Sequence, residues 1–197
     1  MKISDTLFAD ADDQDVRVKR TLANLKQSVL AFAAEHDIGK ASVAEIARRA
    51  GISRSTFYQY AQSPVDLLTR ILCVELDTAR INKLREIEKN PDRFHDVRRA
   101  GMSEVIEHVL RYERVYKNGQ ASSRLALRIV AEHIEQSTLW LIRMGVLNLQ
   151  FENEAIIPIY AAFRGHGVAA AIEAWLRTPA PRNVDLLLDT IEIDFAI

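Results

Sequence analysis

Apolar residues recur along most of the chain at the spacing of an α-helix. In the first clear segment, Leu22, Leu25 and Val29 fall on one helical face. Their spacing predicts a helix over residues 17–36. No alternating apolar and polar run indicates a strand, so the chain is predicted to be all-α, with eight or nine helices. Further helices are expected after Ser42, Ser53 and Ser63 and over 93–116, 120–144, 154–177 and 183–195.

Cap and turn residues divide this pattern into domains. Ser42, Ser53 and Ser63 each precede a helical run, where a serine hydroxyl can accept from an unpaired N–H of the first turn. Pro64 follows at the first helical position, where its missing N–H costs nothing. We expect a small N-terminal domain and a larger helical domain after it. The predicted parts are a disordered acidic tail over 1–16, the small domain over 17–64 and the large domain over 65–197.

Charge changes the picture more than composition does. The net charge is −1, yet residues 17–62 carry eight lysines and arginines against three acids. Residues 1–16 carry five aspartates against one lysine, which is typical of a disordered tail. A basic segment in a chain of near-zero net charge favours contact with a polyanion.

Several classes of protein are not expected from this sequence. It has no apolar stretch long enough to span a membrane and no secretory signal pattern at its start, so we expect a cytoplasmic protein. The single cysteine, Cys73, fits a reducing compartment. No set of acid, base and nucleophile, no metal-ligand spacing and no phosphate-binding glycine loop is present. The sequence therefore predicts neither an enzyme nor a cofactor or metal site.

The chemically informative stretch is residues 41–61. Two short helical runs flank Gly51, which can adopt the left-handed backbone of a tight turn. Phe57 is expected to point back at the first helix. This arrangement is typical of a helix-turn-helix, whose second helix enters the DNA major groove. The alternative is a pair of consecutive helices in a plain bundle.

The side chains of the second short helix favour the DNA interpretation. Arg54 can donate both arms of its guanidinium to a guanine or contact a phosphate. The phenols of Tyr58 and Tyr60 can donate to phosphate oxygens, and the N–H groups near Ser42 can meet another phosphate. The candidate DNA contacts are Ser42, Ser53, Arg54, Ser55, Thr56, Tyr58 and Tyr60.

About residues 17–72 resemble the N-terminal domain of the tetracycline-repressor (TetR) family. The run Arg-Ser-Thr-Phe-Tyr at 54–58 is similar to one branch of that family. Two positions depart from the pattern: Ala61 replaces an aromatic residue, and Pro64 replaces a lysine that contacts phosphate. The matching residues are Ser42, Val43, Ile46, Ala47, Ala50, Gly51, Ile52, Ser53, Thr56, Phe57, Tyr58 and Leu67.

The resemblance implies a homodimeric repressor that a small-molecule effector releases from a palindromic double-stranded DNA operator. The part over 65–197 would then be the regulatory and dimerisation domain, although its late helices could equally form an intramolecular core. The expected dimer-interface residues are Phe163, Gly167, Val168, Ala171, Trp175, Leu187 and Ile191. The candidate effector-pocket residues, which could also be plain core, are His108, Tyr112, Tyr116, His133, Trp140 and Met144.

A second hypothesis comes from the two departures at Ala61 and Pro64. Loss of a phosphate-binding lysine weakens the sequence-independent part of DNA affinity. The chain could therefore be a protein-interaction module that keeps the fold and has lost operator binding. Such a module would show no sequence-specific DNA binding.

Overall fold

A computed structural model describes residues 16–147 and 153–192, and every regular element in these ranges is a helix. The all-α prediction is confirmed. The predicted acidic tail lies outside the described residues except for Val16, where the first helix begins. Within the described ranges, no helix is both long and apolar enough to cross a membrane.

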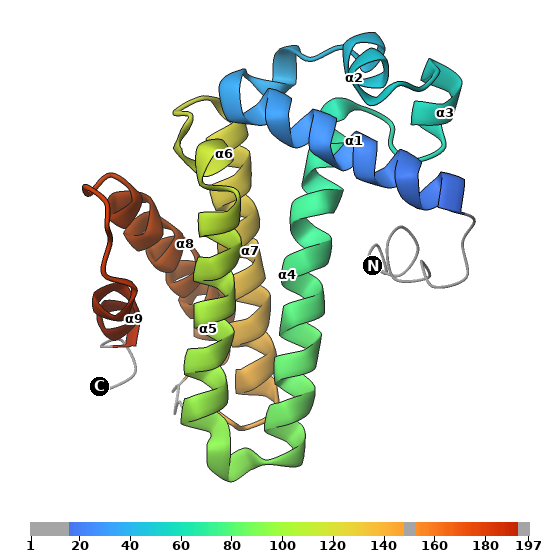
Figure 1. Ribbon diagram of the computed structural model, residues 1–197. Coiled ribbons are helices and arrows are strands. Elements are labelled where there is room, and N and C mark those ends of the chain that lie inside the picture. The colour runs from blue at the N-terminus through green and yellow to red at the C-terminus, as the bar shows by residue number, and fades with distance from the viewer. Residues whose placement is uncertain (1–15, 148–152, 193–197) are drawn as a thin grey trace. The chain divides into compact units, whose positions relative to one another are not determined.

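The chain forms two compact units that alternate along the sequence. The first contains residues up to Glu75 together with Arg114–Ala126, and the second contains Leu76–Glu113 and the residues from Leu127 onward. The long helices α4 and α7 contribute to both units. The α-helices are α1 (Val16–Glu35), α2 (Val43–Ala50), α3 (Arg54–Tyr58), α4 (Pro64–Lys89), α5 (Phe94–Arg111), α6 (Glu113–Lys117), α7 (Ala121–Arg143), α8 (Ile156–Leu176) and α9 (Val184–Glu192) (Figure 1).

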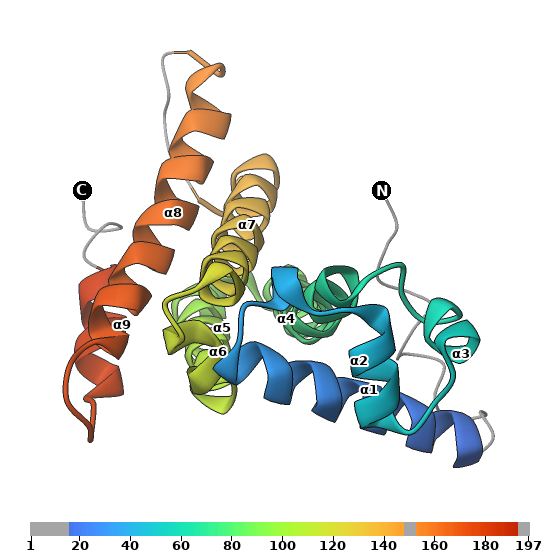
Figure 2. The same ribbon diagram turned by 90° about the horizontal axis from the view of Figure 1, so that it is seen from above.

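The first unit is built on α1. Its buried face carries Leu25 and Val29, which are fully shielded from solvent, so the apolar spacing read from the sequence is confirmed. Both views show α2 and α3 on the same side of α1, with α3 nearer the N-terminal end of that helix (Figures 1 and 2). Asp37 stops α1 and caps a short 3-10 helix, η2 (Ile38–Lys40), by accepting from the Gly39 N–H.

Residues 114–126 cover the C-terminal end of α1. The Ser122 hydroxyl accepts from the Ile38 N–H and donates to the His36 carbonyl, both at 3.0 Å. Asn118 donates from Nδ2 to the Ala33 carbonyl oxygen at 2.5 Å. These bonds satisfy backbone groups that a helix end leaves without intrahelical partners. They tie a late segment of the chain to the N-terminal helices.

The helix predicted over 93–116 is interrupted. A 3-10 turn, η3 (Pro91–Arg93), precedes α5, and Tyr112 separates α5 from α6. The backbone of Tyr112 has φ −111° and ψ 26°, outside the α-helical region, so the chain turns there. Apolar spacing continues across the break, because Val115 is buried in its turn. The pattern alone therefore gave no sign of the interruption.

The second unit contains α5, α8, α9 and the C-terminal parts of α4 and α7. Helix α8 approaches α7 closely at Gly165. A Cβ atom on Gly165 would lie 2.3 Å from the Ala131 carbonyl oxygen, so this position requires glycine. Helix α9 contacts both α5 and α8. Its Leu187, Leu188 and Ile191 are buried.

Candidate nucleic-acid interface and ligand cavity

The helix-turn-helix has the local geometry that its sequence predicts. The Ser42 hydroxyl caps α2 by accepting from the Glu45 N–H at 3.1 Å. Gly51 adopts the left-handed backbone, with φ 70°, and its N–H donates to the Ala47 and Arg48 carbonyl oxygens. The predicted cap and the glycine turn are confirmed.

Helix α3 is short, and a buried aromatic side chain holds it in place. Phe57 is fully buried, and its ring meets the edge of Tyr58 at a centroid distance of 6.0 Å. The Ser53 hydroxyl caps the helix by accepting from the Thr56 N–H at 3.0 Å. A buried aromatic and a capped start hold this five-residue helix in one orientation, which reading a base edge requires.

The predicted DNA contacts form a small polar surface on α3. Arg54 and Tyr58 stand one helical turn apart, and Tyr58 is 59% exposed. Arg54 is exposed and has no hydrogen-bonding or ionic partner among the described residues. The Ser53 hydroxyl lies 2.7 Å from that of Ser55 and 2.9 Å from that of Thr56. The remaining two candidates are Tyr60, which is half-buried, and Ser42, which is exposed at the start of α2.

Further cations lie on the same unit. Arg48 and Lys40 are exposed and have no partner within the described part of the chain. Arg49, by contrast, pairs with Glu45 at 3.0 Å and lies over the Phe32 ring. The sequence showed these residues only as part of a basic segment. The structure separates two available charges from one that is already paired.

The start of α4 differs from the pattern of the resembled family in its charge. Ala61 and Pro64 are both buried, so neither contributes a polar group to the surface. Asp66 accepts from the Gln62 N–H and from the Arg70 Nε, both at 2.8 Å. Burial raises the pKa of Asp66, but these two hydrogen bonds outweigh it and lower the pKa overall. A carboxylate thus stands near the position where the family pattern has a cation.

A cavity of about 90 Å³ lies in the second unit, between α4, α5, α7, α8 and α9. Of the six predicted pocket residues, only His133 lines it. Trp140 borders a separate groove between α4 and α7, and Met144 is exposed. The others lie elsewhere: His108 is buried with its ring 5.1 Å from that of the half-buried Tyr112, and Tyr116 is buried in the first unit.

His133 is buried and neutral. Its Nδ1 atom has no hydrogen-bond partner among the described residues. Burial, with smaller effects from the neighbouring Arg80 and His108, lowers the pKa of His133 to about 3. The imidazole is therefore a polar but uncharged group in the wall of the cavity.

His133→Gln should make the protein more resistant to acid. The unfolded chain takes up a proton on this imidazole below about pH 6.5, whereas the folded protein does not until about pH 3. The contribution of neutral His133 to the free energy of unfolding is thus complete above pH 6.5. Below that pH it falls by roughly 1 kcal/mol per pH unit. Urea unfolding between pH 7 and pH 4 measures this slope.

The matched control for that experiment is His95→Gln, because the imidazole of His95 is exposed. As the pH falls, the free energy of unfolding should decrease less steeply in His133→Gln than in the parent. In His95→Gln it should decrease as steeply as in the parent. Equal slopes in the parent and in His133→Gln would contradict the assignment of a neutral buried imidazole.

The predicted dimer-interface residues divide into two groups. Phe163 is 64% exposed on α8, and Gly167, on the same helix, has open space where a Cβ would be. Ala171 is half-buried. The other four, Val168, Trp175, Leu187 and Ile191, are buried within the protomer. The outer face of α8 also exposes Ile156 and Ile159, and α9 exposes Leu186.

Residues 30–71 match a family model described as bacterial regulatory proteins, tetR family. The matched segment runs from the middle of α1 through α2 and α3 into α4. No curated protein matches the chain. The match covers the helix-turn-helix with parts of its flanking helices, and together with the observed geometry it supports a DNA-binding region of the tetR type there.

Proposed function

We propose that this chain, with its tetR-type helix-turn-helix, is a homodimeric repressor that acts on DNA in the cytoplasm. It binds a palindromic operator, and a small-molecule effector in the second unit releases it. The observation that carries the DNA part of this proposal is the exposed Arg54–Tyr58 face of α3. Arg54 has no partner within the described ranges and lies on a helix held by a buried phenylalanine, so its guanidinium is suited to reading a base edge.

The dimer is supported by α8. This helix is apolar on all sides, although only one side can pack within its own protomer. The exposed residues Ile156, Ile159 and Phe163 follow at intervals of three and four, so they form one stripe. Beside the stripe, Gly167 allows close approach of a second helix. We propose a second copy of this chain as the occupant, because a two-fold interface presents the same stripe twice and yields two reading helices for a palindrome.

The effector site is the cavity of the second unit. Its walls come from five helices, so a ligand there contacts elements from α4 to α9. An effector shifts the equilibrium between DNA-binding and released forms only by its different affinity for the two. Helices α4 and α7 belong to both units, which gives such a difference a physical route to the helix-turn-helix.

A second candidate function rests on the start of α4. Buried Pro64 stands where the resembled pattern has a phosphate-binding lysine, and the carboxylate of Asp66 follows two residues later. If the resulting repulsion exceeds what Arg54 and its neighbours contribute, the chain is an interaction module without an operator. The two functions differ in one measurable property, which is selection of a DNA sequence.

The deciding experiment incubates the purified full chain with a random-sequence DNA library, near physiological salt and with excess non-specific competitor. Enrichment of an inverted repeat supports the dimeric regulator. If the protein is folded and dimeric but enriches no sequence, the repressor proposal fails and the interaction module takes its place.

With the enriched site as probe, Arg54→Ala should weaken binding by roughly 10-fold to 100-fold and relax the preference at one base pair. Tyr58→Phe keeps the ring beside Phe57 and removes only the phenol, so it should weaken all sequences equally, by about 3-fold to 10-fold. Titrations against the site and single-base variants measure both effects. Parent-like binding by both variants would contradict the recognition-helix assignment.

A further inference from the structure

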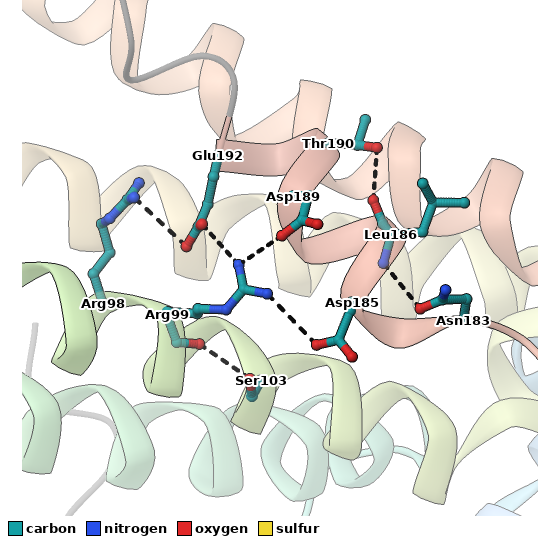
Figure 3. A network of polar contacts seen from close by, with 9 residues as sticks. All are labelled: Arg98, Arg99, Ser103, Asn183, Asp185, Leu186, Asp189, Thr190 and Glu192. Carbon is teal, nitrogen blue, oxygen red and sulfur yellow. Dashed lines mark hydrogen bonds and ion pairs between the residues drawn. The ribbon is translucent and has the colours of Figure 1, made fainter.

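Helix α9 is fastened to α5 by a network of ion pairs. Arg99 of α5 reaches three acids on α9, at 3.5 Å to Asp185, 3.0 Å to Asp189 and 2.8 Å to Glu192 (Figure 3). Arg98 adds a contact of 3.6 Å to the other carboxylate oxygen of Glu192. One carboxylate therefore faces two guanidinium groups.

Glu192 also lines the cavity described above, and the lining is unequal in charge. Four cationic side chains border the cavity: Arg80, Lys83, Arg98 and Arg164. Glu192 is the only acid that lines it among the described residues. Arg80, at 2.8 Å from Asp77, and Lys83, at 3.1 Å from Glu104, are paired with carboxylates outside the lining. Among the described residues, the lining thus holds four cationic side chains and one carboxylate.

Arg164 and Arg98 are cations of this lining that are well shielded from solvent. Arg164 is only 4% exposed and donates to the Thr138 hydroxyl at 3.3 Å. The side chain of Arg98 is 11% exposed, and its distance of 3.6 Å from Glu192 exceeds that of a good charge-assisted hydrogen bond. A shielded guanidinium gains most from a carboxylate that binds it with two short bonds.

The remainder of the wall is mostly apolar, apart from His133, Ser137 and Thr138. Leu84, Val97, Val105, Ile134 and Leu141 line the cavity from α4, α5 and α7. Its volume of about 90 Å³ equals that of roughly three water molecules in the liquid. A short hydrocarbon chain fits this space, whereas a longer one requires a wall to move. Helix α9 is the wall that is held partly by exchangeable ion pairs.

We propose that the cavity binds a small carboxylic acid with an apolar body, and that its carboxylate takes the place of Glu192 beside Arg98. This inference rests on the proposed function, for which it names the chemical class of the effector. The exchange breaks the ion pair between Arg98 and Glu192, one of the four that join α5 to α9 among the described residues. Binding of the acid thereby loosens α9, and the reverse coupling follows by reciprocity.

The test uses the full chain and three pairs of probes: butanoate, hexanoate and octanoate, each against the primary alcohol of the same length. Calorimetric titration and thermal unfolding measure binding. We expect at least one acid to bind and to raise the Tm, because a ligand that binds only the folded state stabilises it. The matching alcohol should do neither. Equal binding of acid and alcohol, or no binding of any acid, would overturn the proposal.

Variants locate the carboxylate. Arg98→Gln should weaken acid binding at least tenfold, because it removes the proposed cation. Glu192→Gln should strengthen acid binding several-fold, because it removes the competing carboxylate, and this variant decides the question if Arg98→Gln fails to fold. Arg124→Gln removes a charge from an exposed position that does not line the cavity, so it should bind like the parent. Weaker acid binding by Glu192→Gln, or parent-like binding by folded Arg98→Gln, would contradict the exchange.

The DNA selection described above is carried out without any ligand, so the two proposals fail separately. A selected inverted repeat together with indifference to all acids removes this inference and leaves the repressor. If the protein selects no DNA sequence but binds an acid in a way that depends on Arg98, the carboxylate site stands and the repressor proposal fails.

Discussion

Gly165→Ala should destabilise the protein by about 3 kcal/mol and lower its Tm by roughly 10 °C. The added methyl group would lie 2.3 Å from the Ala131 carbonyl oxygen and 3.2 Å from the Glu135 Cβ. A carbonyl oxygen of the α7 backbone cannot rotate away as a side chain can. Helix α8 must therefore move from α7, which opens gaps among the side chains buried between them. Chemical and thermal unfolding measure the loss.

The matched control is Gly101→Ala, the same change in the middle of α5. A Cβ there meets only the Lys83 side chain, at 3.5 Å to Cγ and 3.9 Å to Cβ, which is ordinary contact. Alanine is favoured over glycine inside a helix, so this variant should be up to about 1 kcal/mol more stable than the parent. Changes of the same sign and size in both variants would contradict the close packing of α8 on α7.

Local chemistry is what the sequence predicts best. The caps at Ser42 and Ser53 and the left-handed Gly51 depend on atoms a few residues apart, and all three are confirmed. Gly165 is different, although the sequence shows it among many small residues of the late helix. The helix itself carries small and apolar residues around its whole circumference. No stripe indicates which glycine faces α7, so the constraint becomes visible only when the helices are packed.

Contacts between distant segments account for the other omissions. The hydrogen bond that the Ile38 N–H donates to the Ser122 hydroxyl joins residues 84 positions apart, and no periodicity in the sequence predicts it. It is one reason why residues 114–126 belong with the first helices. The sequence pattern does not predict the helix break at Tyr112 either, because apolar spacing continues on both sides of it.

The cavity is lined partly by residue types that the sequence did not single out. The predicted pocket residues are aromatic, methionine or histidine residues; they include His133 and omit Arg98 and Arg164, which also line the cavity. Arginine is found mostly at the surface of proteins, so its residue type alone does not indicate the wall of a cavity. One signal was present in the sequence: Arg164 interrupts an otherwise apolar stretch of the predicted helix over 154–177. A charge in the middle of an apolar helix is costly to bury and indicates a partner or a ligand.

Phe163→Asp should convert the proposed dimer into monomers. The side chain is 64% exposed within its protomer, so the change should leave the fold of the single chain intact. A two-fold interface contains the residue twice, and each copy would place a carboxylate in an apolar contact. With roughly 2 kcal/mol lost per copy, the dimer Kd should rise by about 100-fold to 1000-fold. Analytical ultracentrifugation over a range of concentrations measures it.

The same variant should bind an inverted-repeat operator much more weakly, since one monomer engages one half-site without the second contact of the linked pair. Ile81→Asp is the control, because it places the same acid at an exposed apolar position on α4, away from the stripe on α8. That variant should dimerise and bind DNA like the parent. If folded Phe163→Asp remained as dimeric as Ile81→Asp, the two-fold contact would have to lie on another surface. A parent protein that is monomeric at every concentration would instead leave the exposed stripe on α8 to a different partner.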